Sequence, residues 1–271
     1  MKKKTKTHNT CKIIKLKYLC FFGLIFFYEF KIHKIIYQNK NQKNLKIALC
    51  TMGKKENLYI REYIDYYLKL GVDHLFIYDN NSPNTEKIID CIESSYKNKV
   101  SVYETNSKNI TNQARAFTDC YQNHKYEYDW FLMLDIDEYL FIVNDSLKNY
   151  LNRSIFDKCD IINFHWALAT DNNLVYYDKR TLFERFKGPY VNSIFVKSII
   201  RGNITNLTYA VHSPKISPER NITCDNEGKR LNYSILEIEG VSPISVKKAY
   251  IIHFRYKSTE EFITECYGIN N

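Results

Sequence analysis

The chain has 271 residues, of which 45% are hydrophobic and 15% aromatic, enough for one sizeable packed domain with a small appendage. Its formal net charge of +9 belongs to the tail: residues 1–48 carry twelve Lys and one Glu, and the remainder carries 27 basic and 29 acidic side chains. A nucleic-acid-binding domain carries its positive charge on the folded part. We therefore expect no nucleic acid among the partners.

The tail, residues 1–44, contains a short apolar segment. Seven Lys lie between Lys2 and Lys17 and precede YLCFFGLIFFY, eleven residues at 18–28. A comfortable membrane-spanning helix needs about 20 residues. The segment is therefore an uncleaved signal-anchor of a single-pass type II protein with a luminal domain, or a basic amphipathic segment on the cytosolic membrane surface. A helix packed on the domain is the third alternative. We expect membrane attachment and a polar linker at 40–44.

Strands and helices alternate in the first half of the remaining chain. Short apolar runs predict strands at 45–51, 74–80, 100–104 and 130–134, and helical patterns cover 60–68 (closed by Gly71), 84–96 and 111–122. This alternation indicates an α/β domain with a mostly parallel sheet flanked by helices. Beyond about 155 the pattern becomes irregular strands, clearest at 160–166 and 193–200, with a final helix within 258–267. We divide the domain, 45–271, into halves at 45–150 and 151–271.

The eight cysteines contain no C-x-x-C pair, which argues against a zinc ribbon or a redox dithiol. Several fall inside predicted strands or helices, and we interpret them as small buried hydrophobes. N-glycosylation sequons occur at Asn109, Asn203, Asn206 and Asn221, and they are compatible with a luminal domain.

Residues 131–140, FLMLDIDEYL, drive an apolar strand into three carboxylates, those of Asp135, Asp137 and Glu138. Unpaired like charges are costly to bury, so they lie in a solvated turn or a positive group sits among them. On an extended segment Asp135 and Asp137 point the same way, and Ile136 points into the core. Two such carboxylates suit Mn²⁺ or Mg²⁺, which keep open positions for phosphate oxygens.

The chain resembles a GT-A-type glycosyltransferase of the family 2 kind, near the family 92 group (the former domain of unknown function 23). The resemblance spans about residues 47–268. It is carried by KKENLYIREYIDYYLKLGVDHLFIYDNNSPN, QARAFTDCYQ, WFLMLDIDEYL, LATDNNLVYYDKRTLFERF, FVKSIIRG, VHSP and HFRYKSTEEF, in this order. It implies a GT-A (Rossmann-like) fold with an irregular, mixed acceptor-side region. It also implies transfer of a sugar from a nucleoside-diphosphate sugar to a glycan, protein or lipid acceptor, with inversion and a divalent metal.

The resemblance also assigns the donor-side residues. Asp137 would be the direct metal ligand and Asp135 would lie nearer the ribose. Asp79 would face the nucleotide base at the end of the second strand. Thr51 and Glu56 would line the donor pocket after the first strand, although Lys55 replaces the Asn of the family's usual Asn-Glu pair.

Gln113 and Arg115 match the helix that approaches the nucleotide from the side. An inverting transfer also needs a base to take the acceptor proton, and Asp171 is our candidate, with an Asx-turn residue as the alternative. Glu138 would orient the metal shell or position the acceptor. His253, at the end of an apolar strand, is either a third metal ligand or a satisfied structural histidine.

Two other functions fit parts of this pattern. A nucleotidyltransferase also uses paired acids and Mg²⁺ on an α/β sheet. Such enzymes usually have a Gly-rich phosphate loop near the first strand, whereas TMGKKEN contains one Gly. A catalytically silent carbohydrate-binding or scaffold protein would not need the intact acids.

Overall fold

The computed structural model describes residues 43–105, 112–210, 212–215, 221–231, 241 and 243–267, with backbone alone at 265–267. The chain divides into two units after Asn44, and all described helices and strands lie in the second, Leu45–Asn271. The expected anchor at 18–28 lies outside the described residues. None of the described helices is long and apolar enough to cross a membrane.

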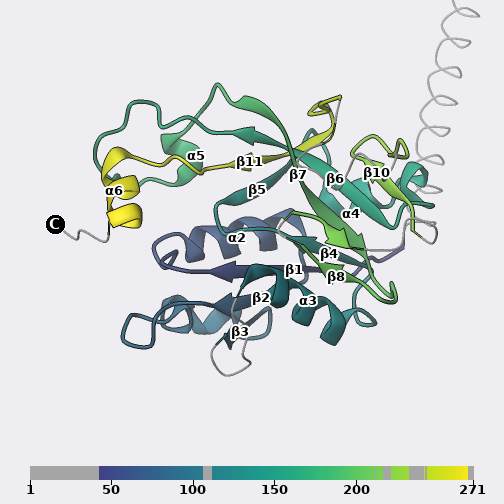
Figure 1. The fold of residues 1–271 in the computed structure, drawn as a ribbon, viewed down its shortest axis with the longest axis horizontal. Helices are drawn as coiled ribbons and strands as arrows, with labels where there is room; N and C mark the ends of the chain where they lie inside the picture. The colour runs from purple at the N-terminus through teal and green to yellow at the C-terminus, as the bar shows by residue number, and fades with distance from the viewer. Residues whose placement is uncertain are drawn as a thin grey trace, which may run out of the picture. The chain divides into compact units, whose positions relative to one another are not determined.

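The domain is built from strands, α-helices and short 3-10 helices (Figure 1). In chain order these are β1 (Ile47–Gly53), α2 (Ile60–Leu70), β2 (His74–Asp79), η1 (Ile88–Cys91), η2 (Ser94–Tyr96), β3 (Val100–Glu104), α3 (Gln113–His124), β4 (Trp130–Met133), β5 (Glu138–Ile142), α4 (Leu147–Leu151), η4 (Ser154–Phe156), β6 (Ile161–Leu168), α5 (Leu182–Arg185), β7 (Val191–Arg201), β8 (Thr208–Tyr209), β9 (Pro214–Lys215), β10 (Thr223–Asp225), β11 (Ala249–His253) and α6 (Thr259–Tyr267).

The central sheet is half parallel and half mixed. Its strand order is β3-β2-β1-β4-β7-β6-β11-β5, with β10 paired to β6. The strands β3, β2, β1 and β4 are parallel, whereas β7 is antiparallel to β4 and to β6, and β5 is antiparallel to β11. The expectation of a mostly parallel sheet is therefore confirmed for the first half of the chain and only partly matched by the second half, where β10 and β11 are parallel to β6 but β7 and β5 run antiparallel to their neighbours.

The order of the strands shows that the sheet curls. Four residues, 134–137, join β4 to β5, yet β7, β6 and β11 lie between these two strands in the sheet. Four strand spacings would separate them by roughly 19 Å in a flat sheet, beyond the reach of a connection folded into a turn. The sheet closes back on itself, and this brings β5 and β11 to the end of β4.

The two faces of the parallel half are covered by different helices. Along β1, Ile47 and Leu49 belong to the core cluster that contains the buried side of α2, whereas Ala48 and Cys50 belong to the cluster of α3. This alternation follows from side chains pointing to opposite faces of a strand. The prediction for α2 is confirmed, including its end at Gly71, which adopts φ 111°.

The helix expected at 84–96 is replaced by η1 and η2, with extended backbone at Ile92 and Glu93. Asp79 explains the start of this region, because its carboxylate accepts hydrogen bonds from the backbone N–H groups of Asn81 and Ile88. These bonds fix the chain as a loop after β2 and leave no room for a continuous helix to begin at residue 84.

Two disulfides correct the interpretation of the cysteines as small hydrophobes. Cys50 in β1 is bonded to Cys120 in α3, and Cys159, just before β6, is bonded to Cys224 in β10. Both pairs are far apart in the sequence, so their pairing depends on the tertiary fold. Cys91 is a free thiol.

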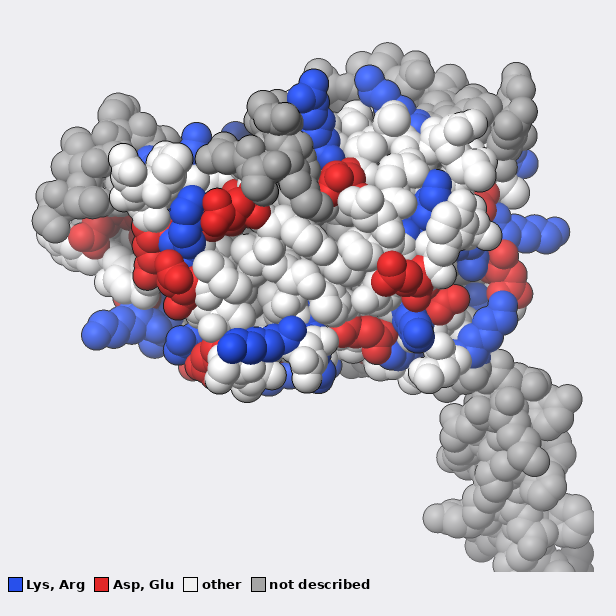
Figure 2. Space-filling model, turned by 90° about the horizontal axis from the view of Figure 1, so that it is seen from below, with Lys and Arg blue, Asp and Glu red and all other residues white. Residues whose placement is uncertain are grey.

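The charged side chains of the domain are mixed in sign. In the face shown in Figure 2, acidic and basic residues alternate around a broad uncharged area, and no single-sign stripe runs across it.

Candidate active site

The candidate site lies where several elements meet at the carboxyl end of β4. The chain makes a turn at 134–137, with the N–H of Glu138 donating to the carbonyl of Asp135 (3.1 Å), and β5 begins at Glu138. The expected extended D-x-D segment is therefore a turn. Ile136 points into the core as predicted and is 1% exposed. In a turn, the two aspartates are free to face different partners, and they do.

Asp135 faces a buried lysine. The Nζ of Lys197 in β7 donates to Asp135 Oδ2 (2.9 Å) and lies 3.6 Å from Glu138 Oε2. The strand register explains this position: Leu132 in β4 pairs with Ile199, so two residues back along antiparallel β7 places Lys197 level with the end of β4. The side chains of Lys197 and Glu138 are both 0% exposed. The positive group that the sequence demanded among the carboxylates is Lys197.

One ammonium group cannot fully balance two carboxylates, and this imbalance shifts the pKa values of Lys197 and Glu138. Burial disfavours the charged lysine, but Glu138 and Asp135 raise the pKa of Lys197 above its ordinary value. Burial, helped by the charge of Asp135 and opposed by Lys197, raises the pKa of Glu138 to about 8. Glu138 Oε2 accepts the backbone N–H of Asp135 (3.0 Å), and its buried Oε1 has no partner.

Asp137 faces a histidine. The antiparallel pairing of β5 and β11 sets His253 opposite Glu138, and the N–H of Phe254 donates to the carbonyl of Asp137 (2.9 Å). As a result, His253 Nε2 lies 3.1 Å from Asp137 Oδ2. Burial disfavours the charged forms of both groups, but their mutual attraction prevails. It holds the pKa of Asp137 well below its usual range and raises the pKa of His253.

The residues present fit a divalent cation on Asp137 and His253. The side chain of Asp137 is 21% exposed, and a carboxylate with an imidazole nitrogen is a common ligand pair. The sequence predicts one cation shared by both aspartates. In the structure Asp135 binds Lys197 and Gln113 instead, which leaves Asp137 and His253 as the ligand pair. Among the described residues, no cluster of three or more His, Cys, Asp or Glu is placed to hold a metal ion. The remaining ligands would come from phosphate oxygens and water.

The start of α3 also reaches the site. Asn112 caps the helix through its side chain, which accepts the N–H of Arg115, and Gln113 Nε2 donates to Asp135 Oδ1. Gln113 therefore approaches the site as expected. The side chain of Arg115 is exposed on the first turn of α3.

The loops after β1 and β11 are joined by an ion pair. Lys257 Nζ lies 3.2 Å from Glu56 Oε2 and 4.2 Å from the ring centroid of Tyr59. This places Glu56 at the carboxyl edge of the sheet, as predicted. The expected loop position of Thr51 is wrong, because Thr51 lies inside β1, where it is 0% exposed.

A small cavity lies beside this edge, between the loops that follow β1 and β2. It measures about 180 Å³ and is lined by Lys54, Lys55, Asn57, Asn81, Ser82, Thr85 and Glu86. Asp79, expected to face a nucleotide base, is 3% exposed and uses both carboxylate oxygens to hold the loop that forms one wall. Its visible contribution is therefore to shape the cavity.

The two expected catalytic carboxylates lie in different surroundings. Glu138 is completely buried, so an acceptor cannot touch it, and it contacts Asp135 and Lys197 instead. Asp171 is exposed and its carboxylate accepts the N–H of Asn173 (3.1 Å) in an Asx turn. Asp171 lies two residues after Ala169, and the N–H of Ala169 donates to the carbonyl of His253. Asp171 Cα is therefore within about 7 Å of Ala169 Cα, close to the site.

An aromatic group covers His253 on the side of β6 and β7. The ring centroids of Trp166 and His253 are 4.5 Å apart, and those of Trp166 and His212 are 5.3 Å apart. Trp166 Nε1, His212 Nδ1 and His253 Nδ1 are buried polar atoms with no partner. Buried polar atoms without a partner are uncommon, and these three lie together beside the candidate site.

Lys197 is the main residue of the candidate site that sequence reasoning did not assign. The signal was present: a lysine in the middle of the apolar strand SIFVKSII, where a buried lysine needs an acidic partner. Choosing among the acids of the chain required the register of β4 and β7, which the sequence does not show.

Comparisons with known proteins identify the family of the chain. The family model described as Glycosyltransferase family 92 matches residues 43–271. The chain therefore belongs to glycosyltransferase family 92. It is similar to family 92 proteins of Oryza sativa subsp. japonica (30% identity over 115 residues, 40% of this chain and 19% of the relative) and of Arabidopsis thaliana (31% over 106 residues, 38% and 18%). A relative from Ricinus communis is 26% identical over 118 residues, 42% of this chain and 21% of the relative.

The match covers about a fifth of the length of these curated relatives. Among solved structures, the chain is similar to HddC from Yersinia pseudotuberculosis, with a TM-score of 0.40 and 14% identity, over 80% of this chain and 100% of that chain.

Proposed function

We propose that the protein is a metal-dependent, inverting glycosyltransferase with a GT-A arrangement, which uses a nucleoside-diphosphate sugar as donor. The observation that carries the proposal is the Asp137–His253 pair at the carboxyl end of the parallel strands, in a chain that belongs to a glycosyltransferase family. In open α/β sheets this edge is where ligands bind.

The two aspartates have separate tasks in this proposal. Asp137 and His253 would hold Mn²⁺ or Mg²⁺, which supplies charge neutralisation for the diphosphate leaving group. Lys197 and Gln113 each donate a hydrogen bond to Asp135, so its carboxylate is fixed in place at the start of α3. Asp135 and Gln113 then present polar atoms to the ribose side of the donor.

The nucleoside would lie along the loops after β1 and β2, over the cavity of about 180 Å³. The Lys257–Glu56 pair holds the loop after β11 against this region and keeps a positive charge near the diphosphate. Arg115, exposed on the first turn of α3, can reach the nucleotide from the side.

The acceptor would approach on the side of Trp166 and His212, whose unpartnered ring nitrogens are buried in this structure. Asp171 is the proposed base: it takes the proton from the attacking hydroxyl of a glycan, protein or lipid as that oxygen bonds to the anomeric carbon. Glu138 supports the site from beneath through Asp135 and is a positioning residue.

We also propose that the domain is luminal and that the tail attaches it to a membrane as a type II anchor. The support is the pair of disulfides, because such bonds form and persist in oxidising compartments.

A thermal-shift screen of nucleoside-diphosphate sugars with and without Mn²⁺ tests the proposal on the full chain. We expect one sugar nucleotide to raise the melting temperature only when Mn²⁺ is present, and then to be hydrolysed slowly. Stabilisation by a nucleoside triphosphate, with release of inorganic diphosphate, would indicate a nucleotidyltransferase instead. Stabilisation by free glycans alone would indicate a binding protein.

A further inference from the structure

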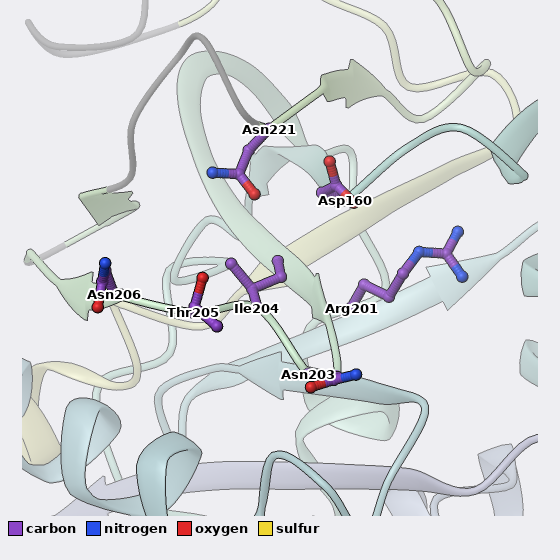
Figure 3. A pocket seen from close by; sticks show the side chains of 8 residues that line it. Asp160, Arg201, Asn203, Ile204, Thr205, Asn206 and Asn221 are labelled. Atoms are coloured by element: carbon purple, nitrogen blue, oxygen red, sulfur yellow. The ribbon is translucent and has the colours of Figure 1, made fainter.

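A second pocket lies at the edge of the sheet opposite the candidate active site. It has a volume of about 320 Å³ and is lined mainly by polar side chains (Figure 3). Arg201 lines it and pairs with Trp130 at the amino end of β4, whereas Asp135 follows the carboxyl end of the same strand. The pocket is therefore separated from the candidate active site by the length of β4.

Three asparagines of N-glycosylation sequons surround this pocket. Asn203 and Asn206 come from the segment after β7, in the sequons Asn203-Ile-Thr205 and Asn206-Leu-Thr208. Asn221, in Asn221-Ile-Thr223, comes from the segment before β10 and lies across the pocket from them (Figure 3). The fold gathers the sequons of two separate segments on one face.

The segment after β7 presents its two asparagines to solvent. Ile204 and Leu207 are 8% and 0% exposed and anchor it to the core, whereas Asn203, just before Ile204, and Asn206, just before Leu207, are exposed. Both asparagines adopt left-handed backbone, with φ of 64° and 57°, a conformation that asparagine tolerates in turns.

Backbone contacts hold this turn in place. The N–H of Asn203 donates to the carbonyl of Lys125 (2.8 Å), and Gln122 Nε2 donates to the carbonyl of Leu207 (2.6 Å). Because the turn is fixed by its main chain, a large group on either asparagine side chain projects into solvent without disturbing the core. The half-buried Asn221 offers less room.

From these observations together with the two disulfides, we infer that the turn Asn203–Thr208 carries an N-linked glycan, attached to Asn203 or Asn206. In the transfer, the Nδ2 atom of the asparagine bonds to the anomeric carbon of a lipid-diphosphate-linked oligosaccharide and loses one proton. The bond from that carbon to the diphosphate oxygen breaks, and the lipid diphosphate leaves. The two asparagines are three residues apart, within about 10 Å, so one chain carries one glycan here.

This inference is independent of the proposed glycosyltransferase activity. The glycan would cover the pocket of about 320 Å³ and leave the opposite edge of the sheet open to the donor. It places residues 203–208 in the lumen, the compartment in which the disulfides form.

Site-resolved mass spectrometry of the full chain, expressed in a eukaryotic secretory host, tests the inference. Removal of N-glycans by peptide N-glycosidase in heavy-oxygen water converts each glycosylated Asn to labelled Asp. Trypsin then releases Gly202–Lys215, which contains Asn203 and Asn206, apart from Asn221–Lys229. We expect one labelled Asp in the first peptide.

Variants make the result specific. In Asn203→Gln the label should be found at Asn206, and in Asn206→Gln it should be found at Asn203. The double variant N203Q/N206Q should lose it, as should T205V/T208V, which keeps both asparagines. Asn192→Gln, an exposed asparagine outside any sequon, is the matched control and should leave the label unchanged. An unlabelled Gly202–Lys215 peptide from wild-type protein would overturn the inference, whatever the donor-binding result.

Discussion

At the scale of single residues, the candidate site is organised around one buried lysine. Lys197 touches Asp135 and Glu138, and neither Lys197 nor Glu138 is exposed to water. The arrangement resolves the electrostatic difficulty of three acids in four positions. It also separates Asp135, which is held by protein groups, from Asp137, which faces His253 at the surface of the site.

Replacing Lys197 by Met should destabilise the domain strongly, because it leaves Glu138 and Asp135 without their positive partner. Loss of one partner of a buried ion pair costs about 3–5 kcal/mol in the free energy of unfolding. Urea unfolding monitored by fluorescence measures this loss. In the double variant K197M/D135N the cost should be smaller than the sum of the single variants, since the carboxylate that Lys197 binds is removed together with the ammonium group. Additive effects would show that the pair is not coupled.

The proton on Glu138 predicts a pH dependence of stability. Its pKa is raised to about 8 in the fold, against an ordinary value of 4.5, so between these values the folded state binds a proton that the unfolded state lacks. This contribution to stability is full below pH 4.5 and is lost as the pH rises toward 8. We expect the unfolding free energy to fall over this range and Glu138→Gln to flatten the slope. An unchanged slope in the variant would contradict the assignment.

At the scale of elements, the disulfides connect parts of the sheet to the segments that cover it. Cys50–Cys120 ties β1 to α3, and α3 also delivers Gln113 to the site. Cys159–Cys224 ties the start of β6 to β10. Both bonds close long loops and so restrict the unfolded chain.

Alkylation without reduction checks this pairing. In denatured wild-type protein, iodoacetamide should modify Cys91 but not the four bonded cysteines. Cys120→Ala should lower the unfolding free energy by about 2–5 kcal/mol and expose Cys50 to alkylation. Cys91→Ala is the control and should change neither. Alkylation of Cys50 in the unreduced wild-type protein would show that the bond is absent.

The sequence was most informative where local chemistry decides the structure. Periodicity placed α2 and β1 to β4, and the glycine after α2 marked its end. It failed at 84–96, because a carboxylate from β2 captures the backbone of the next segment. It also missed the curl of the sheet, since the pairing of β5 with β11 depends on contacts more than a hundred residues apart. The same holds for the site. Asp137 belongs to a local sequence motif and could be predicted, whereas the position of Lys197 depends on the register between β4 and β7.

At the scale of the whole molecule, the two proposed sites lie at opposite edges of the sheet. The carboxyl edge of the parallel strands holds the acids, His253 and Lys257, and the opposite edge holds the sequon turn. With the donor site on one edge of a luminal domain and the glycan on the other, the glycan would not obstruct donor binding.

The most direct test of the central claim is donor turnover by the full-length Asp137→Ala variant across a Mn²⁺ titration, measured as nucleoside diphosphate released from the sugar nucleotide that stabilises the wild type. We predict a loss of more than about a hundredfold and of the Mn²⁺ dependence. Glu93→Ala, which removes an exposed carboxylate paired with Arg61, should retain wild-type turnover. Wild-type turnover with unchanged Mn²⁺ dependence in Asp137→Ala would contradict the account.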